Sequence, residues 1–227
     1  MMRLLAFDTS TDRLSVAVRH GDAVRAHEGA GGAQASSTLI PLIQRLLAEA
    51  GLTLGQLDAI AFGRGPGSFT GLRTACAVTQ GLGFGAGVPL LPVDTLHAVA
   101  EEARERHGAT RVVALLDARM DQVYAARYEL AADGSAMQAH SEVEALAPQD
   151  VRVPAGWVLA GNAFAAYGER LPAAPRLDAL PAAAALLRLA PGLLAAGHQV
   201  APSDAWPLYV RDKVAQTTAE RAAARNT

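Results

Sequence analysis

The sequence has little of what several kinds of site require. Cys76 is its only cysteine, so no disulfide can form within the chain, and a reducing compartment is expected. None of the six histidines lies three or four positions from another, which excludes a zinc site built on one helix. No uninterrupted apolar run reaches the roughly 18 residues of a membrane span. We therefore expect a cytoplasmic protein with neither a signal peptide nor a membrane segment.

The chain also lacks an excess of basic over acidic residues. The chain of 227 residues has a formal net charge of −2, and Lys213 is its only lysine. Without an overall basic field, tight unaided binding to nucleic acid is not expected, so contact with RNA requires a local patch or a partner. Hydrophobic residues make up 51% of the chain, which is enough for the core of one or two domains.

The first half of the chain predicts a mixed α/β sheet. Residues 3–29 alternate β-rich runs with turn residues, which is typical of three antiparallel strands. Apolar spacing then predicts a helix over 36–50, a strand over 58–62, a helix from about 70, a strand over 88–93 and a helix over 95–107. A meander followed by crossover units is expected to form a sheet with helices on its faces.

The opening pattern recurs in the second half. The segment "LLAFDTSTDRLSVAV" (4–18) aligns with "VALLDARMDQVYAAR" (113–127), so that Asp8 and Asp12 fall on Asp117 and Asp121. Each copy is an apolar strand that ends in Asp and is followed by a turn and a second strand. We therefore predict an internal duplication.

The rest of the second half gives weaker signals. They predict strands over 111–117 and 122–130, a third strand within 134–146, a strand over 156–161, and helices over 162–170 and 181–196. We expect domains at 1–106 and 107–202, with the segment 203–227 packing back on the first.

The loop "GRGPGSFTGLR" (63–73) fails the known phosphate fingerprints. A Walker loop requires lysine after its last glycine, where this chain has Leu72, and both the dinucleotide and the esterase-elbow spacings are absent. Two interpretations remain: an anion site at a helix N-terminus, or a structural turn whose Ser68 or Thr70 caps the helix. The candidate anion or nucleotide contacts are Asp8, Gly65, Gly67, Ser68 and Thr70. The four repeated aspartates are either turn formers or a carboxylate cluster.

The helix beyond the loop carries a row of small residues. Gly71, Ala75, Thr79 and Gly83 are spaced by four, so one ridge has almost no side chains. Such a ridge lets another element approach closely, and that element is either part of this chain or a partner subunit.

Four segments resemble the TsaB (formerly YeaZ) family. They are "LLAFDTST" at the start, "AFGRGPGSFTGLRTACAVTQGL" (61–82), "VALLDARMDQVY" (113–124) and "PLYVR" (207–211). The family is similar to TsaD/Kae1 proteins within the actin/Hsp70-like superfamily. The resemblance implies an α/β fold of two duplicated ribonuclease-H-like lobes, each a mixed sheet flanked by helices.

The resemblance also implies a role. Family members are partner subunits of the system that forms N6-threonylcarbamoyladenosine at position 37 of tRNAs reading codons that begin with A. A TsaD-like transferase and a TsaE-like ATPase are the implied partners, with tRNA met only through the complex and a homodimer formed when the chain is alone. No cofactor is expected on this chain alone, and ATP or ADP is expected only at the partner complex.

The implied interface uses the first two helices of the N-terminal lobe. The residues assigned to it are Leu39, Leu42, Ile43, Leu46, Gly71, Arg73, Ala75, Thr79 and Gly83. The metal-binding His-x-x-x-His pair of TsaD-like proteins falls on Thr95 and Val99, which predicts neither a metal nor catalysis here. Ala35 stands where many relatives carry a histidine, so no function is assigned to that position. The alternatives are a nucleotide-dependent enzyme of the sugar kinase type and, on historical grounds, a peptidase.

Overall fold

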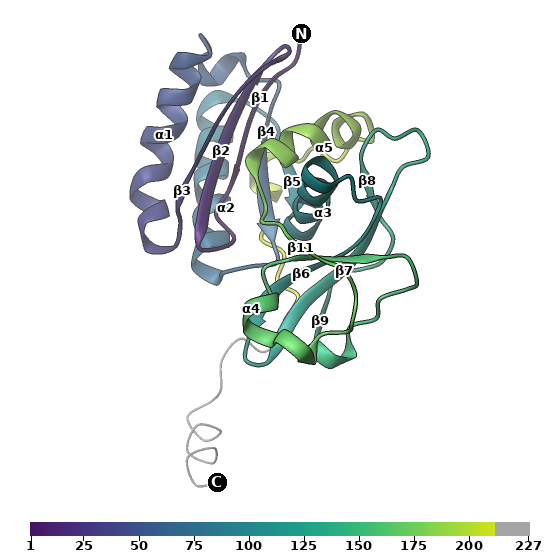
Figure 1. Ribbon diagram of the computed structural model, residues 1–227. Helices are drawn as coiled ribbons and strands as arrows, with labels where there is room; N and C mark the ends of the chain where they lie inside the picture. Colours follow the sequence, from purple (N-terminus) through teal and green to yellow (C-terminus); the bar gives the residue numbers. More distant parts are fainter. Residues whose placement is uncertain (212–227) are drawn as a thin grey trace, which may run out of the picture.

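The computed structural model describes residues 1–211 and contains two sheets with helices between and around them (Figure 1). The strands of the first sheet are β1 (Arg3–Asp8), β2 (Arg13–His20), β3 (Ala23–Ala30), β4 (Ala59–Gly65) and β5 (Leu90–Asp94). They lie in the order β3-β2-β1-β4-β5, with β1, β4 and β5 parallel and β2 and β3 antiparallel to their neighbours. The predicted meander and crossover units are confirmed.

The second sheet repeats this topology. Its strands are β6 (Arg111–Arg119), β7 (Gln122–Leu130), β8 (Met137–Ala139), β9 (Glu144–Leu146), β10 (Val158–Gly161) and β11 (Arg176–Asp178). The order β11-β10-β6-β7-β8 is that of the first sheet when β6, β7, β8, β10 and β11 replace β1 to β5. The predicted duplication is therefore confirmed. The single strand predicted within 134–146 is wrong, because β8 and β9 pair separately with β7.

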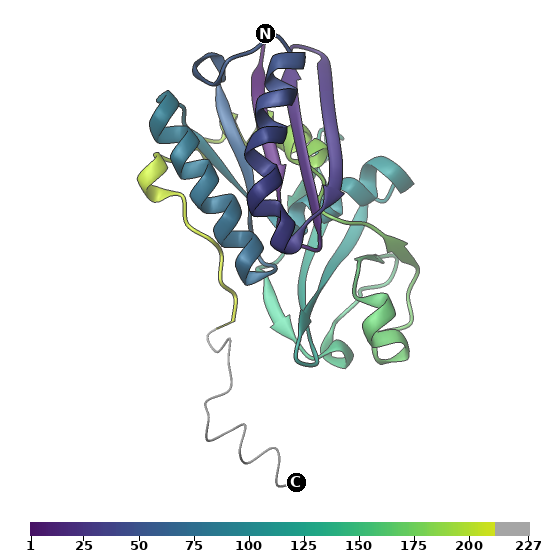
Figure 2. The same cartoon turned by 90° about the vertical axis from the view of Figure 1, so that its left-hand side faces the viewer.

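Two helices cover the outer face of the first sheet. They are α1 (Ala35–Glu49) and α2 (Phe69–Ala86), which lie side by side in Figure 2. The side chains of Leu5 and Phe7 in β1 point toward these helices, whereas Leu4 and Ala6 belong to the core on the opposite face. Both faces of the sheet are buried, which explains why its strands are almost continuously apolar.

Each of the two helices between the sheets packs on the sheet of the other lobe. The helix α5 (Ala183–Ala195) packs on the first sheet, where Leu186 and Ala190 share a core with Leu4. The helix α3 (Thr95–His107) packs on β6 of the second sheet. The predicted boundary at 106/107 therefore separates the strands but not the helices. The predicted helix over 162–170 is only the four-residue α4 (Phe164–Tyr167) and a following 3-10 turn.

A buried carboxylate links α3 to α5. Glu101 has no exposed side-chain surface, and it pairs with Arg104 at 2.6 Å and with Arg188 of α5 at 3.1 Å. One of its oxygens also accepts the backbone N–H of Met137 at 3.2 Å. Arg188 in turn pairs with Glu102 at 2.8 Å. Charged groups thus hold together the two helices that join the lobes.

The segment after α5 runs back along α2, and we call residues 202–211 the strap. Ala205 is buried, and its carbonyl oxygen accepts hydrogen bonds from Cys76 Sγ and Gln80 Nε2 of α2. The backbone N–H of Leu208 donates to the carbonyl oxygen of Arg64 at 2.7 Å. The described part of the predicted segment 203–227 therefore packs on the first lobe, and the remainder lies outside the described residues.

The strap ends on the second lobe. Arg211 donates to the carbonyl oxygens of Ala118 and Arg119, at 2.8 Å and 3.2 Å, in the turn that joins β6 to β7. That turn has left-handed backbone at Arg119, Met120 and Asp121. The strap therefore connects α2 of the first lobe to the β6–β7 turn of the second.

Candidate functional site

The glycine loop (63–73) is hydrogen-bonded to the turn between β1 and β2 and packs closely against it. The N–H of Ser68 donates to the carbonyl oxygen of Ser10 at 2.7 Å, and Thr9 Oγ1 donates to the carbonyl oxygen of Gly71 at 2.8 Å. A Cβ atom on Gly67 or Gly71 would overlap the carbonyl oxygens of Ser10 and Thr9 respectively. These glycines therefore allow the start of α2 to press directly on the turn.

Neither predicted hydroxyl caps α2. Ser68 occupies the N-cap position, yet its side chain makes no capping hydrogen bond. Thr70 lies inside the helix, where its carbonyl oxygen accepts the hydroxyl of Thr74 at 3.0 Å. The turn interpretation is correct in outline, but contact between backbones replaces the expected side-chain cap.

Asp8 is a buried turn former. Its Oδ1 accepts the N–H of Ser10 at 2.8 Å and the Ser10 hydroxyl at 2.6 Å. Its Oδ2 is buried without a hydrogen-bond partner and lies against Gly63, where a Cβ atom would overlap it. Burial raises the pKa of this carboxyl to about 6. The carboxylate is thus enclosed by the strand ends.

We expect the stability of the protein to fall as the pH rises through about 6, because Asp8 must then ionise without solvent. Its folded pKa is raised from 3.8 to about 6, so the extra stability is complete below pH 3.8 and lost above pH 6. The change corresponds to about 3 kcal/mol. The Asp8→Asn variant keeps both acceptor contacts to Ser10 and should lack this dependence. Urea unfolding of both proteins between pH 4 and 7.5 measures it.

Asp58 provides a control, because its contribution to stability should change with pH in the opposite direction to that of Asp8. Its hydrogen bond from Arg3 lowers the pKa of this exposed carboxyl. Relative to wild type, Asp58→Asn should therefore lose a small amount of stability as the pH rises, whereas Asp8→Asn gains. If wild type and Asp8→Asn show parallel pH profiles, Asp8 is not an enclosed titrating group.

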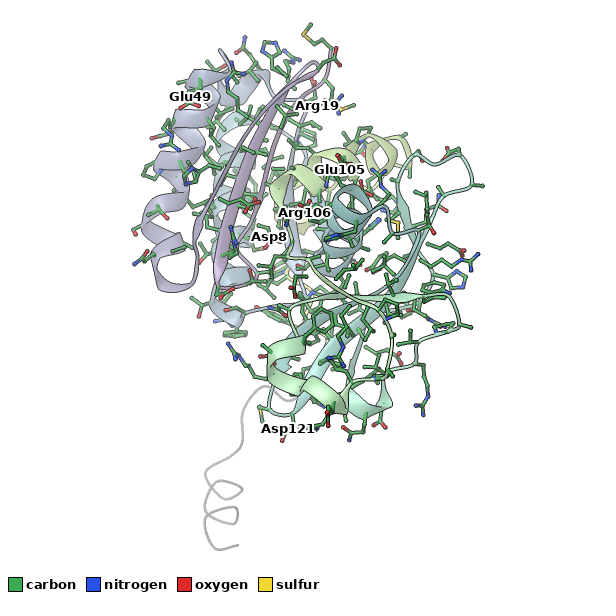
Figure 3. The ribbon with its side chains drawn as sticks, in the orientation of Figure 1. Asp8, Arg19, Glu49, Glu105, Arg106 and Asp121 are labelled. Carbon is green, nitrogen blue, oxygen red and sulfur yellow. The ribbon has the colours of Figure 1, made fainter. Side chains whose placement is uncertain are left out.

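The four repeated aspartates do not form a carboxylate cluster. Asp117 Oδ1 accepts the N–H of Arg119 and the hydroxyl of Tyr167, while Asp121 pairs with Arg170 at 2.7 Å. Figure 3 shows Asp8 inside the first lobe and Asp121 far from it, at the outer turn of the second. Within residues 1–211, no group of three or more His, Cys, Asp or Glu side chains could hold a metal. The turn-former interpretation is correct for Asp8 and Asp117, each of which accepts a backbone N–H two residues on.

A cleft of about 690 Å³ separates the two hairpin turns. One wall comes from the β1–β2 turn and the start of α2, and the other from the β6–β7 turn, while the strap runs between them. Its lining is apolar at Phe69, Leu72, Leu116, Met120, Tyr124, Leu208 and Val210. Two carboxylates, Asp12 and Asp117, and two arginines, Arg119 and Arg211, also line it.

The backbone N–H groups of the turn and the loop are not free to bind a phosphate group. The N–H groups of Ser10 and Ser68, which the turn and the loop would supply as donors, both bond within the chain. Of the candidate anion contacts, Gly67 and Ser68 line the cleft, whereas Asp8, Gly65 and Thr70 do not. Gly65 instead lies under the carbonyl oxygen of Leu208. Contact of Asp8 or Gly65 with an anion or nucleotide stays a prediction. That this chain alone holds no nucleotide stays a prediction.

Nearly all the residues predicted to contact a partner are buried within the chain. The apolar side chains of α1 pack on the first sheet, and the small-residue ridge of α2 packs on the β1–β2 turn, β5 and the strap. The buried residues are Leu39, Leu42, Ile43, Leu46, Gly71, Ala75, Thr79 and Gly83. The close approach along this ridge is made by the chain itself, and the assignment of these residues to a partner interface stays a prediction. Arg73 alone of the set is exposed.

The exposed face of α2 is formed by other residues. It presents Thr70, Arg73, Ala77, Gly81 and Phe84, which follow one another at helical spacing. Arg73 is the only charged residue among the 18 of α2. A surface helix normally carries a polar outer face, so this one resembles a helix that is covered on both sides.

No helix within the described part of the chain is long and apolar enough to cross a membrane.

The two repeated lobes, with a cleft between their hairpin turns, define a two-lobed α/β protein of the actin/Hsp70-like class. A family model described as TsaD: tRNA N6-adenosine threonylcarbamoyltransferase matches residues 27–218. The tRNA threonylcarbamoyladenosine biosynthesis protein TsaB of Escherichia coli (strain K12) is 36% identical over 233 residues, which cover 94% of this chain and 96% of that protein. The chain belongs to the TsaB (YeaZ) family.

Solved structures agree with this assignment. YeaZ from Pseudomonas aeruginosa is 43% identical, with a TM-score of 0.87, and the match covers 92% of this chain and 100% of that one. A second structure, described as an uncharacterized protein with similarity to peptidase YEAZ from Pseudomonas aeruginosa, is 42% identical with a TM-score of 0.87. That match covers 93% of this chain and 100% of the other.

Proposed function

We propose that this chain is a non-catalytic partner subunit that binds a TsaD-like transferase through the outer surface of α1 and α2. In this role it supports the formation of N6-threonylcarbamoyladenosine at position 37 of tRNAs that read codons beginning with A, together with a TsaE-like ATPase. The observation that carries the proposal is the exposed, almost uncharged face of α2. Depletion of charge with retained aromatic residues is typical of the centre of a protein interface.

The absence of catalysis is supported by the positions where TsaD-like proteins hold their metal. Thr95 and Val99 occupy them, and both are fully buried. His97, which lies between them, bonds through Nε2 to the carbonyl oxygen of Met137 and stacks on Tyr128. Burial lowers the pKa of His97, which favours its neutral form. The only histidine near these positions therefore serves the packing of α3.

A peptidase mechanism finds no support in the loop. It would need a nucleophile hydrogen-bonded to a base. Ser68 is exposed at the start of α2, and within residues 1–211 no histidine or carboxylate bonds to its hydroxyl. The same face of α2 is available for self-association when the transferase is absent.

The Ala77→Arg substitution should abolish binding to a TsaD-like partner while leaving the fold intact. Ala77 is exposed at the middle of the α2 face, where a long charged side chain would hold the partner away. Analytical gel filtration of the mixed proteins measures the complex, and reconstituted tRNA modification with and without this chain measures its role. Ala132→Arg, at an exposed position after β7, is the matched control.

Two results would contradict the proposal. Modification that proceeds equally well without the chain would remove the functional role. Normal binding by Ala77→Arg would instead show that the transferase docks elsewhere. Ala75→Arg cannot serve as the test, because Ala75 is buried and its replacement would disturb the fold.

A further inference from the structure

The outer edge of β3 is the only long strand edge that stays open within residues 1–211. β3 stands at the end of the first sheet, beside α1 (Figure 1), and all eight of its residues pair with β2. At the other end of that sheet, β5 has five residues, and the backbone of its Leu90 is bonded to Val200. The outer strands of the second sheet, β8, β9 and β11, have three residues each. Natural proteins usually shorten or cover such edges, and β3 is neither short nor covered.

The pairing pattern determines which backbone groups of β3 point outward. In an antiparallel pair, alternate residues exchange backbone hydrogen bonds with the neighbouring strand, and the residues between them direct their N–H and C=O groups away. Gly31 donates to the carbonyl oxygen of Asp12 at 2.8 Å in the register that joins β2 to β3, so the odd-numbered residues of β3 bond to β2. The outward groups therefore belong to Val24, Ala26, Glu28 and Ala30. They form the row of donors and acceptors that a further strand requires.

A groove of about 470 Å³ runs alongside this edge, between β3 and α1. His27 and Gly29 of β3 line it on one side, and Ser37, Pro41 and Arg45 of α1 line it on the other. Because side chains alternate between the two faces of a strand, the odd-numbered residues of β3 face α1. A strand added to the edge would continue this alternation, so every second side chain of it would lie at the groove. Backbone bonds and side-chain pockets are thus combined at one place, as in other sites that bind an added strand.

The charge of the groove favours an acidic occupant. His27 and Arg45 are the only ionisable residues that line it, and Arg45 Nη2 lies 3.3 Å from His27 Nδ1. Arg25 lies on the same face of β3 as His27, two residues earlier. The Arg45 side chain is 55% exposed, and its ion pair is a 3.7 Å contact with Glu49 on the same helix. A carboxylate on the α1 face of an added strand would therefore complement the groove.

The same charges disfavour a second copy of β3 as the occupant. Outward backbone groups belong to the even-numbered residues, so two β3 strands paired about a twofold axis would place their odd-numbered residues on one face. Arg25 and His27 of both copies would then gather beside Arg45, with no carboxylate among them. Like charges that lie opposite each other destabilise a sheet. A segment of another protein that carries Asp or Glu avoids this repulsion.

We propose that the edge of β3 is a strand-addition site for an extended segment of another protein, with an Asp or Glu side chain of that segment against Arg45. The site goes beyond the proposed function, because it lies away from the exposed face of α2. α2 packs on β4, which stands three strands from β3 in the sheet. The chain thus offers a second binding surface that leaves the α2 face open.

Two pools of eight-residue peptides test the proposal with the full chain. Both pools alternate Thr or Val with variable residues, and the central variable positions carry Glu in the acidic pool and Lys in the basic pool. Amide hydrogen exchange, followed by NMR, measures binding. The acidic pool should protect the amides of Val24, Ala26, Glu28 and Ala30, because their outward N–H groups become bonded. It should bind about fivefold more tightly than the basic pool.

Ala26→Pro is the sharpest variant, because it removes one outward N–H and leaves the bonds between β2 and β3 in place. It should weaken binding of the acidic pool about fivefold. Ala26→Thr keeps this N–H and is the matched control, which should bind normally. Arg45→Glu should reverse the preference of the site, so that the basic pool binds more tightly. Thermal unfolding checks that each variant is folded.

Four results would overturn the proposal. If neither pool protects the β3 amides of wild type, the edge does not accept a strand. If both pools bind equally, Arg45 does not select an acidic segment. If the same amides become protected without peptide as the protein concentration rises, a second copy occupies the edge. Unchanged binding by both Ala26→Pro and Arg45→Glu would show that the peptides bind elsewhere.

Discussion

Replacing Gly71 by alanine should lower the free energy of unfolding by about 3 kcal/mol or more, although alanine is the better helix former. The reason is contact with the β1–β2 turn. A Cβ atom at this position would overlap the carbonyl oxygen of Thr9, which is backbone and cannot rotate away. The start of α2 would have to move outward, and the Thr9 and Ser68 hydrogen bonds to this region would break.

The same helix provides a matched control for this substitution. Gly81 lies at an exposed helical position, and a Cβ atom there would meet nothing within 4 Å. Gly81→Ala should therefore raise the free energy of unfolding by up to about 1 kcal/mol through helix propensity alone. Urea denaturation of the monomer at low concentration measures both changes. Equal effects of the same sign at the two positions would show that Gly71 does not sit in a tight contact.

This contrast also shows what the sequence could predict about α2. Spacing by four correctly indicated a bare ridge and a close approach. It could not identify the neighbour, because the β1–β2 turn lies far earlier in the chain and carries no complementary pattern. The ridge that faces solvent, Ala77 to Gly85, is displaced by only two residues from the buried one. A pattern of small residues around much of a helix therefore predicts tight packing without giving its direction.

The duplication, by contrast, could be predicted from the sequence because its features are local. Each copy consists of two strands and a turn, and its Asp8 or Asp117 binds backbone N–H groups only two residues away. Such local features leave a trace in the sequence. The exchange of α3 and α5 between the sheets leaves none, because the apolar pattern of a helix does not identify the sheet on which it packs. Likewise, nothing in "AWPLY" indicates that Trp206 stays exposed beside a buried Ala205.

The Glu101→Gln variant should lose about 3 kcal/mol of stability, the second large effect that we expect. The side chain of Glu101 is 0% exposed and pairs with Arg104 and Arg188, so the neutral amide would leave two guanidinium groups without their shared carboxylate. Removing one member of a buried ionic network costs more than the net value of the network, because the remaining charges are poorly solvated, and Arg104 and Arg188 are only 22% and 27% exposed. Arg188 keeps its pair with Glu102. The loss should separate α3 from α5 and thereby loosen the two lobes.

A surface pair provides the matched control for this last change. Glu129 pairs with Arg111 at 3.0 Å, but the two side chains are 41% and 51% exposed. Glu129→Gln should therefore cost less than about 1 kcal/mol, since solvent screens an exposed pair. Hydrogen exchange adds a readout that a merely local loss would not change: Glu101→Gln should increase exchange in both α3 and α5. If the two variants unfold at the same urea concentration, Glu101 does not hold the lobes together, and apolar packing alone joins these helices.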